Sequence, residues 1–234
     1  MTTLDSRFST PVPLIKVEAV TRVYLAGQQA VQALRGVDLE VPRGILAALM
    51  GRSGSGKTTL LNLIGGLDAP TCGSVYFDGQ ALAGMSDNEL THLRRQRMGF
   101  VFQSFALMPT YTAFENVELL LRMNGMGRKE RGERARRCLH GVGLSKWMDH
   151  RPAEMSGGQQ QRLSIARAIA TRPDLILADE PTGELDSATT RQIAALFRHL
   201  VEKEGVTILL TTHNPILVEY ADQVFYMKDG QKAR

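Results

Sequence analysis

The chain has 234 residues, of which 43% are hydrophobic and 22% charged, and its formal net charge is +4. This composition is typical of a soluble globular domain, and the modest charge does not by itself indicate a nucleic-acid partner. No apolar run approaches the roughly 18 residues of a membrane span, and residues 1–13 lack the apolar core of a secretory signal, so we expect a cytoplasmic protein. The two cysteines, Cys72 and Cys138, have no second Cys or His at metal-ligand spacing.

In chain order, a polar segment over residues 1–13 predicts a loose N-terminal tail before a single domain at 14–234. Apolar runs bounded by turn residues predict strands at 14–24, 37–41, 45–50, 73–79, 98–102, 174–179, 206–210 and 224–227. Helical spacing and capping residues predict helices at 59–64, 87–96, 158–171 and 188–203 and from Pro215 onward. Residues 104–156 interrupt this α/β alternation with two or three helical patterns, which predicts an inserted helical subdomain.

The segment between the strand at 45–50 and the helix at 59–64 has the pattern G-x-x-x-x-G-K-[ST] of a phosphate-binding P-loop. The strand–loop–helix setting favours this interpretation over a Gly/Ser-rich turn with a chance lysine. Backbone N–H groups and the positive end of the helix dipole would face phosphate oxygens. The candidate ATP-binding residues are Gly51, Arg52, Ser53, Gly54, Ser55, Gly56, Lys57, Thr58 and Thr59.

Two acids, Asp179 and Glu180, end the apolar strand at 174–179. Beside a P-loop, Asp179 would hold a Mg²⁺-bound water and Glu180 could polarise the attacking water. The alternative is a pair of solvated acids at a strand–loop junction.

Met155-Ser156-Gly157-Gly158-Gln159 precedes a strongly helical segment and offers a second helix N-terminus for an anion. An ordinary helix cap formed by Ser156 is the alternative. Two anion-binding sites in one chain would make sense in a dimer, where the Ser156 to Gln159 segment of a second subunit faces the nucleotide bound at the P-loop of the first subunit.

Taken together, these motifs resemble those of the ATP-binding-cassette (ABC) ATPases, over residues 14–230. The resemblance assigns Gln103 to the Q-loop, His213 to the switch histidine, and 183–186 with Asp186 to the D-loop, and it makes Ser156 to Gln159 the signature. Tyr24 stands where the family stacks an aromatic ring on adenine. Each has a structural alternative. Gln103 could be a strand-end polar residue and His213 a residue before the Asn214 cap. Asp186 could be a helix N-cap and Tyr24 an edge-strand aromatic. The chain departs from the family in Met155, normally Leu, and in Glu184, commonly Asn, Ala or Ser.

The resemblance implies an α/β fold: a P-loop core with a mixed sheet, an antiparallel β subdomain and the helical insertion. It also implies that two copies bind two ATP molecules head to tail, each between the P-loop of one copy and the signature of the other. In that arrangement Thr58, Gln103 and Asp179 would bind Mg²⁺, Glu180 would act on the attacking water, and His213 would contact the γ-phosphate.

Four further stretches, 30–37, 62–68, 99–103 and 178–183, resemble the macrolide-export, lipoprotein-release and cell-division group of this family. The resemblance implies a separate four-span permease with a large extracytoplasmic domain and a peripheral location on the cytoplasmic face of the inner membrane. Phe105, Leu107 and Met108 would form the permease-binding surface, or else belong to the subdomain core. The basic stretch 128–137 also carries acids, so we interpret it as a solvated helix face; lipid attraction is the alternative. We expect no nucleic-acid partner; the alternative function is a non-transport ATPase acting on nucleic acid or in a cell-division complex.

Overall fold

The structure, a computed structural model, describes residues 12–27 and 29–233, so most of the expected N-terminal tail lies outside the described residues. A six-stranded sheet has the order β10-β9-β3-β8-β7-β6. Its strands β3, β6, β7, β8 and β9 pair in parallel, and β10 adds an antiparallel edge. The strands are β3 (Leu46–Met50), β6 (Met98–Val101), β7 (Leu175–Asp179), β8 (Thr207–Thr212), β9 (Gln223–Lys228) and β10 (Gln231–Lys232). This is the expected mixed sheet.

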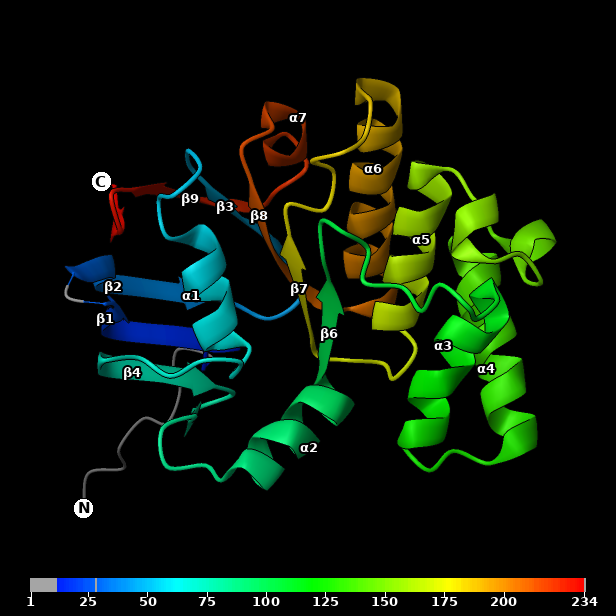
Figure 1. The fold of residues 1–234 in the computed structure, drawn as a ribbon, viewed down its shortest axis with the longest axis horizontal. Coiled ribbons are helices and arrows are strands. Elements are labelled where there is room, and N and C mark those ends of the chain that lie inside the picture. Colours follow the sequence, from blue (N-terminus) through cyan, green and yellow to red (C-terminus); the bar gives the residue numbers. More distant parts are fainter. Residues whose placement is uncertain (1–11, 28, 234) are drawn as a thin grey trace, which may run out of the picture.

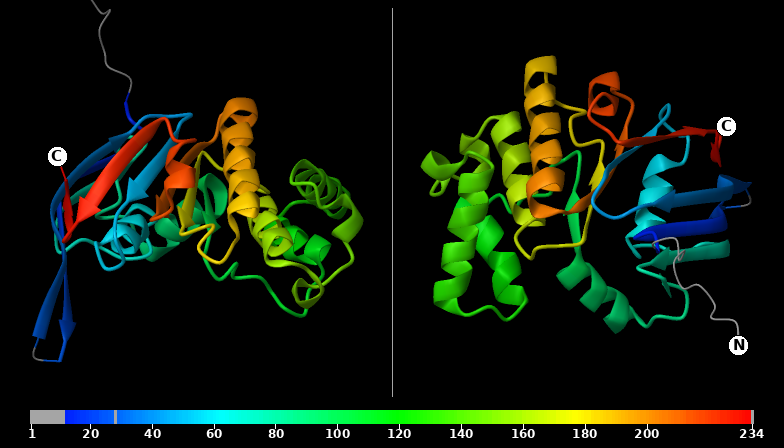
Figure 2. Two further views of the ribbon diagram at one scale, coloured as in Figure 1. Left: turned by 90° about the horizontal axis from the view of Figure 1, so that it is seen from above. Right: turned by 180° about the vertical axis from the view of Figure 1, so that it is seen from behind.

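A second sheet is antiparallel throughout and has the order β2-β1-β4-β5. It consists of β1 (Ile15–Ala26), β2 (Gln29–Val41), β4 (Cys72–Phe77) and β5 (Gln80–Ala81). Strands β1 and β2 form a long hairpin that projects from the body of the molecule (Figure 2). The sequence predicts only 37–41 as the second strand, because the exposed residues before it show no alternation; pairing with β1 extends the strand back to Gln29.

Helices cover the parallel sheet and form a separate lobe beside it (Figure 1). Helix α1 packs between the two sheets, whereas α3, α4 and α5 form the lobe. The helices are α1 (Lys57–Ile64), α2 (Asp87–Arg97), α3 (Ala113–Met123), α4 (Arg128–Gly141), α5 (Gly157–Ala168), α6 (Ser187–Glu204) and α7 (Pro215–Val218), with short 3₁₀ turns at Ser145–Trp147 and Pro152–Glu154. Helices α3 and α4 thus lie within the predicted insertion. No described helix is long and apolar enough to span a bilayer.

The sequence signals for the helix starts are confirmed in detail. Ser86 caps α2: its hydroxyl accepts a hydrogen bond from the Glu89 N–H, and the Glu89 carboxylate accepts one from the Ser86 N–H. In α6 the apolar stripe from Ile193 to Val201 is buried as its spacing predicts. Helix α5 is shorter than expected: it ends at Ala168, and Ile169 is only partly buried.

Two hydrophobic cores lie on opposite faces of the parallel sheet. Along β3, Ala47 and Leu49 belong to the core shared with α1 and the antiparallel sheet. Leu46 and Ala48 belong to the core shared with α6 and the helical lobe. Because successive side chains of a strand point to opposite faces, an almost wholly apolar strand fits only such a doubly covered sheet. The covered sheet is therefore a rigid support for residues at its carboxyl edge.

Asp78, at the turn after β4, receives hydrogen bonds from Arg43 and Arg97. The guanidinium of Arg43, and then that of Arg97, holds the pKa of Asp78 below its usual range. A carboxyl group with a depressed folded-state pKa stabilises the fold above its unfolded pKa, and this contribution is lost as the pH falls through the folded value.

Accordingly, Asp78→Asn is expected to lower the free energy of unfolding at pH 7 by about 1 kcal/mol. Asparagine tolerates the positive φ of 53° at this position, so the change tests the charge rather than the backbone. Urea unfolding from pH 7 toward pH 3 measures it, and the gap to the wild type should close in acid. Asp229→Asn, at a φ of 50° with no ion pair among the described residues, is the matched control. A gap that stays constant down to pH 3 would contradict the prediction.

Candidate nucleotide-binding site

The predicted P-loop connects β3 to α1 at the carboxyl edge of the parallel sheet. Gly51 must be glycine here, because a Cβ would lie 2.4 Å from the Met227 carbonyl oxygen. Gly56 has a φ of 97°, which favours glycine, and directly precedes α1. The first N–H groups of α1 have no partner within the helix and therefore face the loop. The result is a backbone cradle for an anion.

Lys57 and Ser55 place polar side chains inside this cradle. Lys57 is 6% exposed, and its Nζ donates to the carbonyl oxygens of Gly51 (2.8 Å) and Arg52 (3.1 Å). Ser55 is also 6% exposed, and its Oγ is buried without a hydrogen-bond partner among the described residues. A buried hydroxyl without a partner is costly, whereas a phosphate oxygen would accept its hydrogen. These observations fit a bound phosphate chain.

Thr58 of α1 lies beside Asp179 at the end of β7. Strand β7 ends at Asp179, and the Thr58 hydroxyl lies 3.0 Å from Asp179 Oδ1. A P-loop hydroxyl and a strand-end carboxylate form the oxygen donor set by which P-loop enzymes hold Mg²⁺. The described residues contain no cluster of three His, Cys, Asp or Glu side chains that could hold a metal ion.

Glu180 lies next to the P-loop lysine and the predicted switch histidine. Its Oε1 is 3.4 Å from Lys57 Nζ, and its Oε2 is 3.0 Å from His213 Nδ1. The backbone of Glu180 has a φ of 44°, a left-handed conformation that is uncommon for residues other than glycine. The structure thus brings Asp179 and Glu180 to the P-loop, and it places His213 on the far side of Glu180 from Lys57.

Gln103 follows β6, and its amide lies against the predicted D-loop. A Cβ added to Gly183 would lie 3.2 Å from Gln103 Nε2. The segment after Gln103 is unusual: Phe105 and Ala106 both have positive φ, and Arg167 of α5 donates to both of their carbonyl oxygens. Burial lowers the pKa of Arg167. Nothing in the sequence distinguishes Arg167 from an ordinary polar residue of a helix.

The predicted signature forms the N-terminus of α5. The Ser156 hydroxyl accepts from the Gln159 N–H at 3.3 Å, and Gln159 Oε1 accepts from the Ser156 N–H at 2.8 Å. Figure 1 shows the N-terminal ends of α1, α5 and α6 directed toward the same side of the molecule. The signature therefore shares this side with the P-loop, but it lies on the other lobe.

Asp186 and Tyr24 occupy places that their structural alternatives also explain. Asp186 caps α6 by accepting from the N–H groups of Ala188 and Thr189, and the hydrogen bond from the Thr189 hydroxyl is the main cause of its lowered pKa. The Tyr24 hydroxyl donates to Asp68, and the guanidinium of Arg22 lies 4.5 Å from the ring centre. Among the described residues, no hydrogen bond joins Tyr24 to the P-loop.

Thr211 of β8 is a second site residue that the sequence motifs do not indicate. Its hydroxyl contacts Asp179 and the Glu180 N–H. The available signal is two threonines between the apolar run 206–210 and His213.

Together, a P-loop lysine, a P-loop threonine on a strand-end aspartate and an adjacent glutamate define a P-loop nucleoside triphosphatase. The family described as "ABC transporter" matches residues 34–183. The chain is 45% identical over 225 residues to the uncharacterized ABC transporter ATP-binding protein MJ0796 of Methanocaldococcus jannaschii, covering 94% of this chain and 96% of that one. It is 46% identical over 222 residues to the macrolide export ATP-binding/permease protein MacB of Marinobacter nauticus, covering 95% of this chain but only 34% of that one.

A solved structure gives the same result. The dimeric post-hydrolysis state of the ATP-binding cassette MJ0796, bound to ADP and Pi, superposes with a TM-score of 0.87 at 44% identity, covering 94% of this chain and 97% of that one. The chain belongs to the ABC transporter ATP-binding family. It is an ATPase that binds and hydrolyses ATP.

Proposed function

We propose that two copies of this chain close head to tail around two ATP molecules and thereby drive a separate membrane permease. The observation that carries the proposal is the split arrangement of the site. Lys57 contacts Glu180 and Thr58 contacts Asp179, whereas the signature at Ser156 to Gln159 lies on the helical lobe, on the same side of the molecule. A second copy would bring its signature to this P-loop. The dimeric cassettes among the solved relatives support this arrangement.

In this dimer the side chains near the phosphates have distinct roles. Lys57 exchanges its contact with Glu180 for the β- and γ-phosphates, and the freed Glu180 accepts a proton from the attacking water. His213 holds Glu180 and the γ-phosphate. Catalysis is then mainly positioning and charge stabilisation.

Thr58, Asp179 and Gln103 would hold Mg²⁺, which neutralises phosphate charge when it is bound. Tyr24 would stack on adenine with the ring face opposite Arg22. The helix N-terminus at Ser156 to Gln159 would face the γ-phosphate of the partner's ATP, and Asp186 would lie at the contact between the two copies.

A groove of about 390 Å³ between α2, β6, α3 and α5 is the proposed permease-binding surface. Its lining is mostly apolar, and Leu67, Met108 and Met123 on its walls are about half exposed. Phe105 and Leu107, by contrast, are only partly exposed, and Leu107 packs on the core. Arg95 at the groove has no ion pair among the described residues. This chemistry fits a cytoplasmic permease helix with an apolar face and a carboxylate.

The MacB relatives support a permease as the occupant, since they are ATP-binding/permease proteins of which this chain spans about a third. We propose a four-span permease with a large extracytoplasmic domain, in a system of the macrolide-export or lipoprotein-release type. The ATPase would then be peripheral, on the cytoplasmic face of the inner membrane. Magnesium and ATP are its proposed cofactors.

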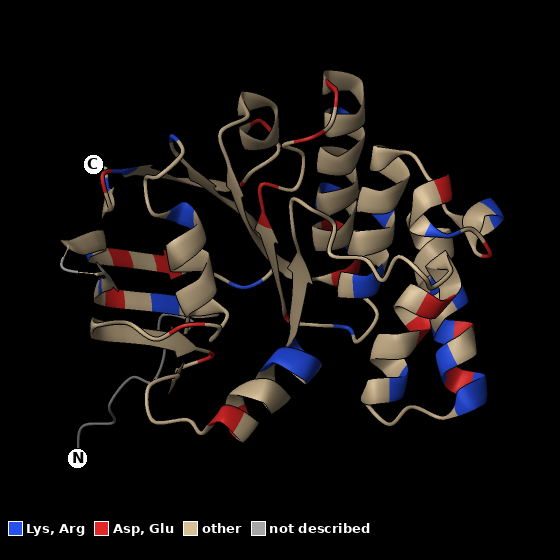
Figure 3. Cartoon of the chain, viewed as in Figure 1, with Lys and Arg blue, Asp and Glu red and all other residues tan. Residues whose placement is uncertain are grey.

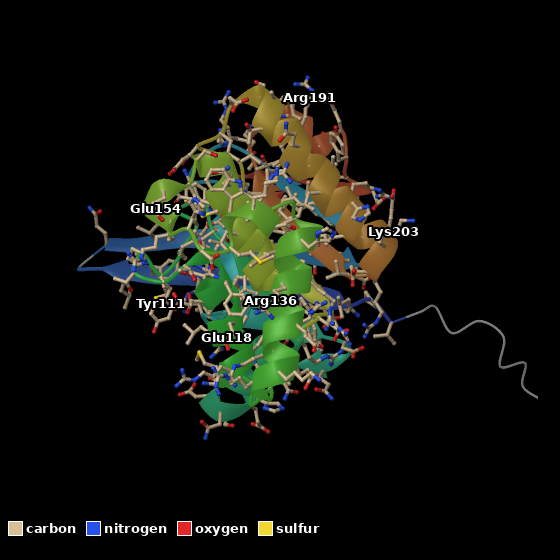
Figure 4. The ribbon with its side chains drawn as sticks, turned by 90° about the vertical axis from the view of Figure 1, so that its right-hand side faces the viewer. Tyr111, Glu118, Arg136, Glu154, Arg191 and Lys203 are labelled. Carbon is tan, nitrogen blue, oxygen red and sulfur yellow. The ribbon has the colours of Figure 1, made fainter. Side chains whose placement is uncertain are left out.

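The basic stretch 128–137 supports no nucleic-acid function. Figure 3 shows charges of both signs along α4. Arg131 pairs with Glu118, and Arg134 donates to the carbonyl oxygens of Ile169 and Ala170. Arg136 lies over the ring of Phe114, on the side of the lobe seen in Figure 4. These contacts hold the helical lobe together and support the interpretation of the stretch as a solvated helix face with mixed charges.

Met123→Glu tests the groove. Co-expression with a four-span permease of the proposed type should raise the wild-type ATPase rate. Met123→Glu should abolish that stimulation while leaving the basal rate within about twofold, because a charge in an apolar interface costs several kcal/mol. Val12→Glu, a change at another well-exposed apolar residue outside the groove, is the control. Equal stimulation of Met123→Glu and the wild type would reject the groove, and the absence of both complex and stimulation in the wild type would reject the permease.

A further inference from the structure

Thr211 lies on β8, between β3 and β7, directly opposite Asp179 in the parallel register. It is fully buried, at 0% exposure, and the two preceding residues of the strand are buried leucines. A hydroxyl in such a position is costly unless both its hydrogen and its oxygen have partners.

Both partners are acids of the ATPase site. The Thr211 hydroxyl oxygen accepts from the Glu180 N–H at 2.9 Å, and its single hydrogen therefore goes to Asp179 Oδ1 at 2.6 Å. The direction is fixed, because a backbone N–H can only donate and a carboxylate can only accept. One side chain thus contacts both residues of the acid pair.

We propose that Thr211 is a positioning residue that sets the geometry of both acids for hydrolysis. Its hydrogen bond to Oδ1, together with that of Thr58, fixes the rotamer of Asp179. No hydrogen bond to Oδ2 occurs among the described residues, so this oxygen is available to a metal-bound water. Its bond to the Glu180 N–H holds the backbone at the φ of 44° that aims the carboxylate at Lys57 and His213. A left-handed backbone at a residue other than glycine is strained, and it persists only where neighbouring groups hold it.

Thr207 provides a matched comparison on the same strand. It is 1% exposed, and its hydroxyl accepts a backbone N–H, that of Gly44, at 2.9 Å. It lies at the opposite end of β8 from the acids. Thr207→Val and Thr211→Val therefore both remove a buried hydroxyl from a backbone donor, but only the second touches the acid pair.

The test compares Thr211→Val, Thr211→Ser and Thr207→Val. Thr211→Val should lower kcat by about 10- to 100-fold, the usual effect of losing a group that orients a metal ligand, with KM for ATP within about threefold. It should also reduce the factor by which Mg²⁺ tightens equilibrium ATP binding. Thr211→Ser should restore both quantities, and Thr207→Val should lower the melting temperature without changing kcat by more than about twofold.

The inference rests on the proposed roles of Asp179 and Glu180, and the two can fail separately. An active Glu180→Gln would overturn the proposed role of Glu180. An inactive Glu180→Gln beside a Thr211→Val with wild-type kcat and Mg²⁺ dependence would overturn the role of Thr211 alone, as would an equal loss of kcat in Thr207→Val. If Thr211→Val does not fold, Thr211→Cys, which is similar in size and only a weak hydrogen-bonding group, takes its place with the same expected losses.

Discussion

Glu180→Gln is expected to lower ATP turnover by about 10²- to 10⁴-fold, the range typical of a lost general base. Glutamine has almost the same shape and can still hydrogen-bond to His213, but it cannot take a proton from water. It also removes a negative charge 3.4 Å from Lys57, where the triphosphate would lie. With repulsion and hydrolysis both reduced, an ATP-bound dimer should accumulate.

Single-turnover hydrolysis and size-exclusion chromatography in ATP and Mg²⁺ measure the two effects together. Glu130→Gln on α4 removes the same charge from the helical lobe and should behave as the wild type. Hydrolysis by Glu180→Gln at close to the wild-type rate would show that another group activates the water.

Mixing two inactive variants should restore activity if the P-loop and the signature act in trans. Lys57→Ala disables the P-loop, and Ser156→Arg places a bulky cation in the signature, so each variant alone should be inactive. In a mixed dimer one site combines the two defects, and the other combines an intact P-loop with an intact signature. Random mixing makes half of the dimers mixed, so about a quarter of the wild-type activity should return.

The ATPase rate is measured for each variant and for the mixture over a range of protein concentrations. Circular dichroism checks that both variants fold, since Ser156→Arg also removes the α5 cap. Recovery should depend on total protein concentration. No recovery on mixing, or a wild-type rate per subunit that stays constant on dilution to the monomer, would show that one chain hydrolyses ATP alone.

Local chemistry explains which parts of the fold the sequence predicts. Some features are predicted because a few neighbouring residues determine them: the P-loop at 51–58, the Ser86–Glu89 cap and the apolar stripe on α6. The early start of β2 and the two-residue strands β5 and β10 are missed, because their pairing partners decide them. Such pairing depends on tertiary structure rather than on local pattern.

The same distinction applies to the site. The P-loop glycines and lysine and the two acids at the end of a strand form recognisable sequence motifs. The motifs predict the contacts that these residues make in the structure. Thr211 and Arg167 act through partners 31 and 32 or 61 and 62 residues away, and nothing in their immediate neighbours indicates those partners. The left-handed conformation of Glu180 is likewise invisible in a sequence that places an ordinary glutamate there.

The two hydrogen bonds from Arg167 have a consequence for communication between two ATP molecules. They tie the segment after Gln103, which borders the groove, to the helix that begins with the signature. In the proposed dimer that helix faces the partner's nucleotide rather than the chain's own. A permease helix that displaces the groove of one copy would therefore act first on the ATP bound at the P-loop of the other copy. Binding of a permease to one ATPase subunit would thus affect hydrolysis in its partner.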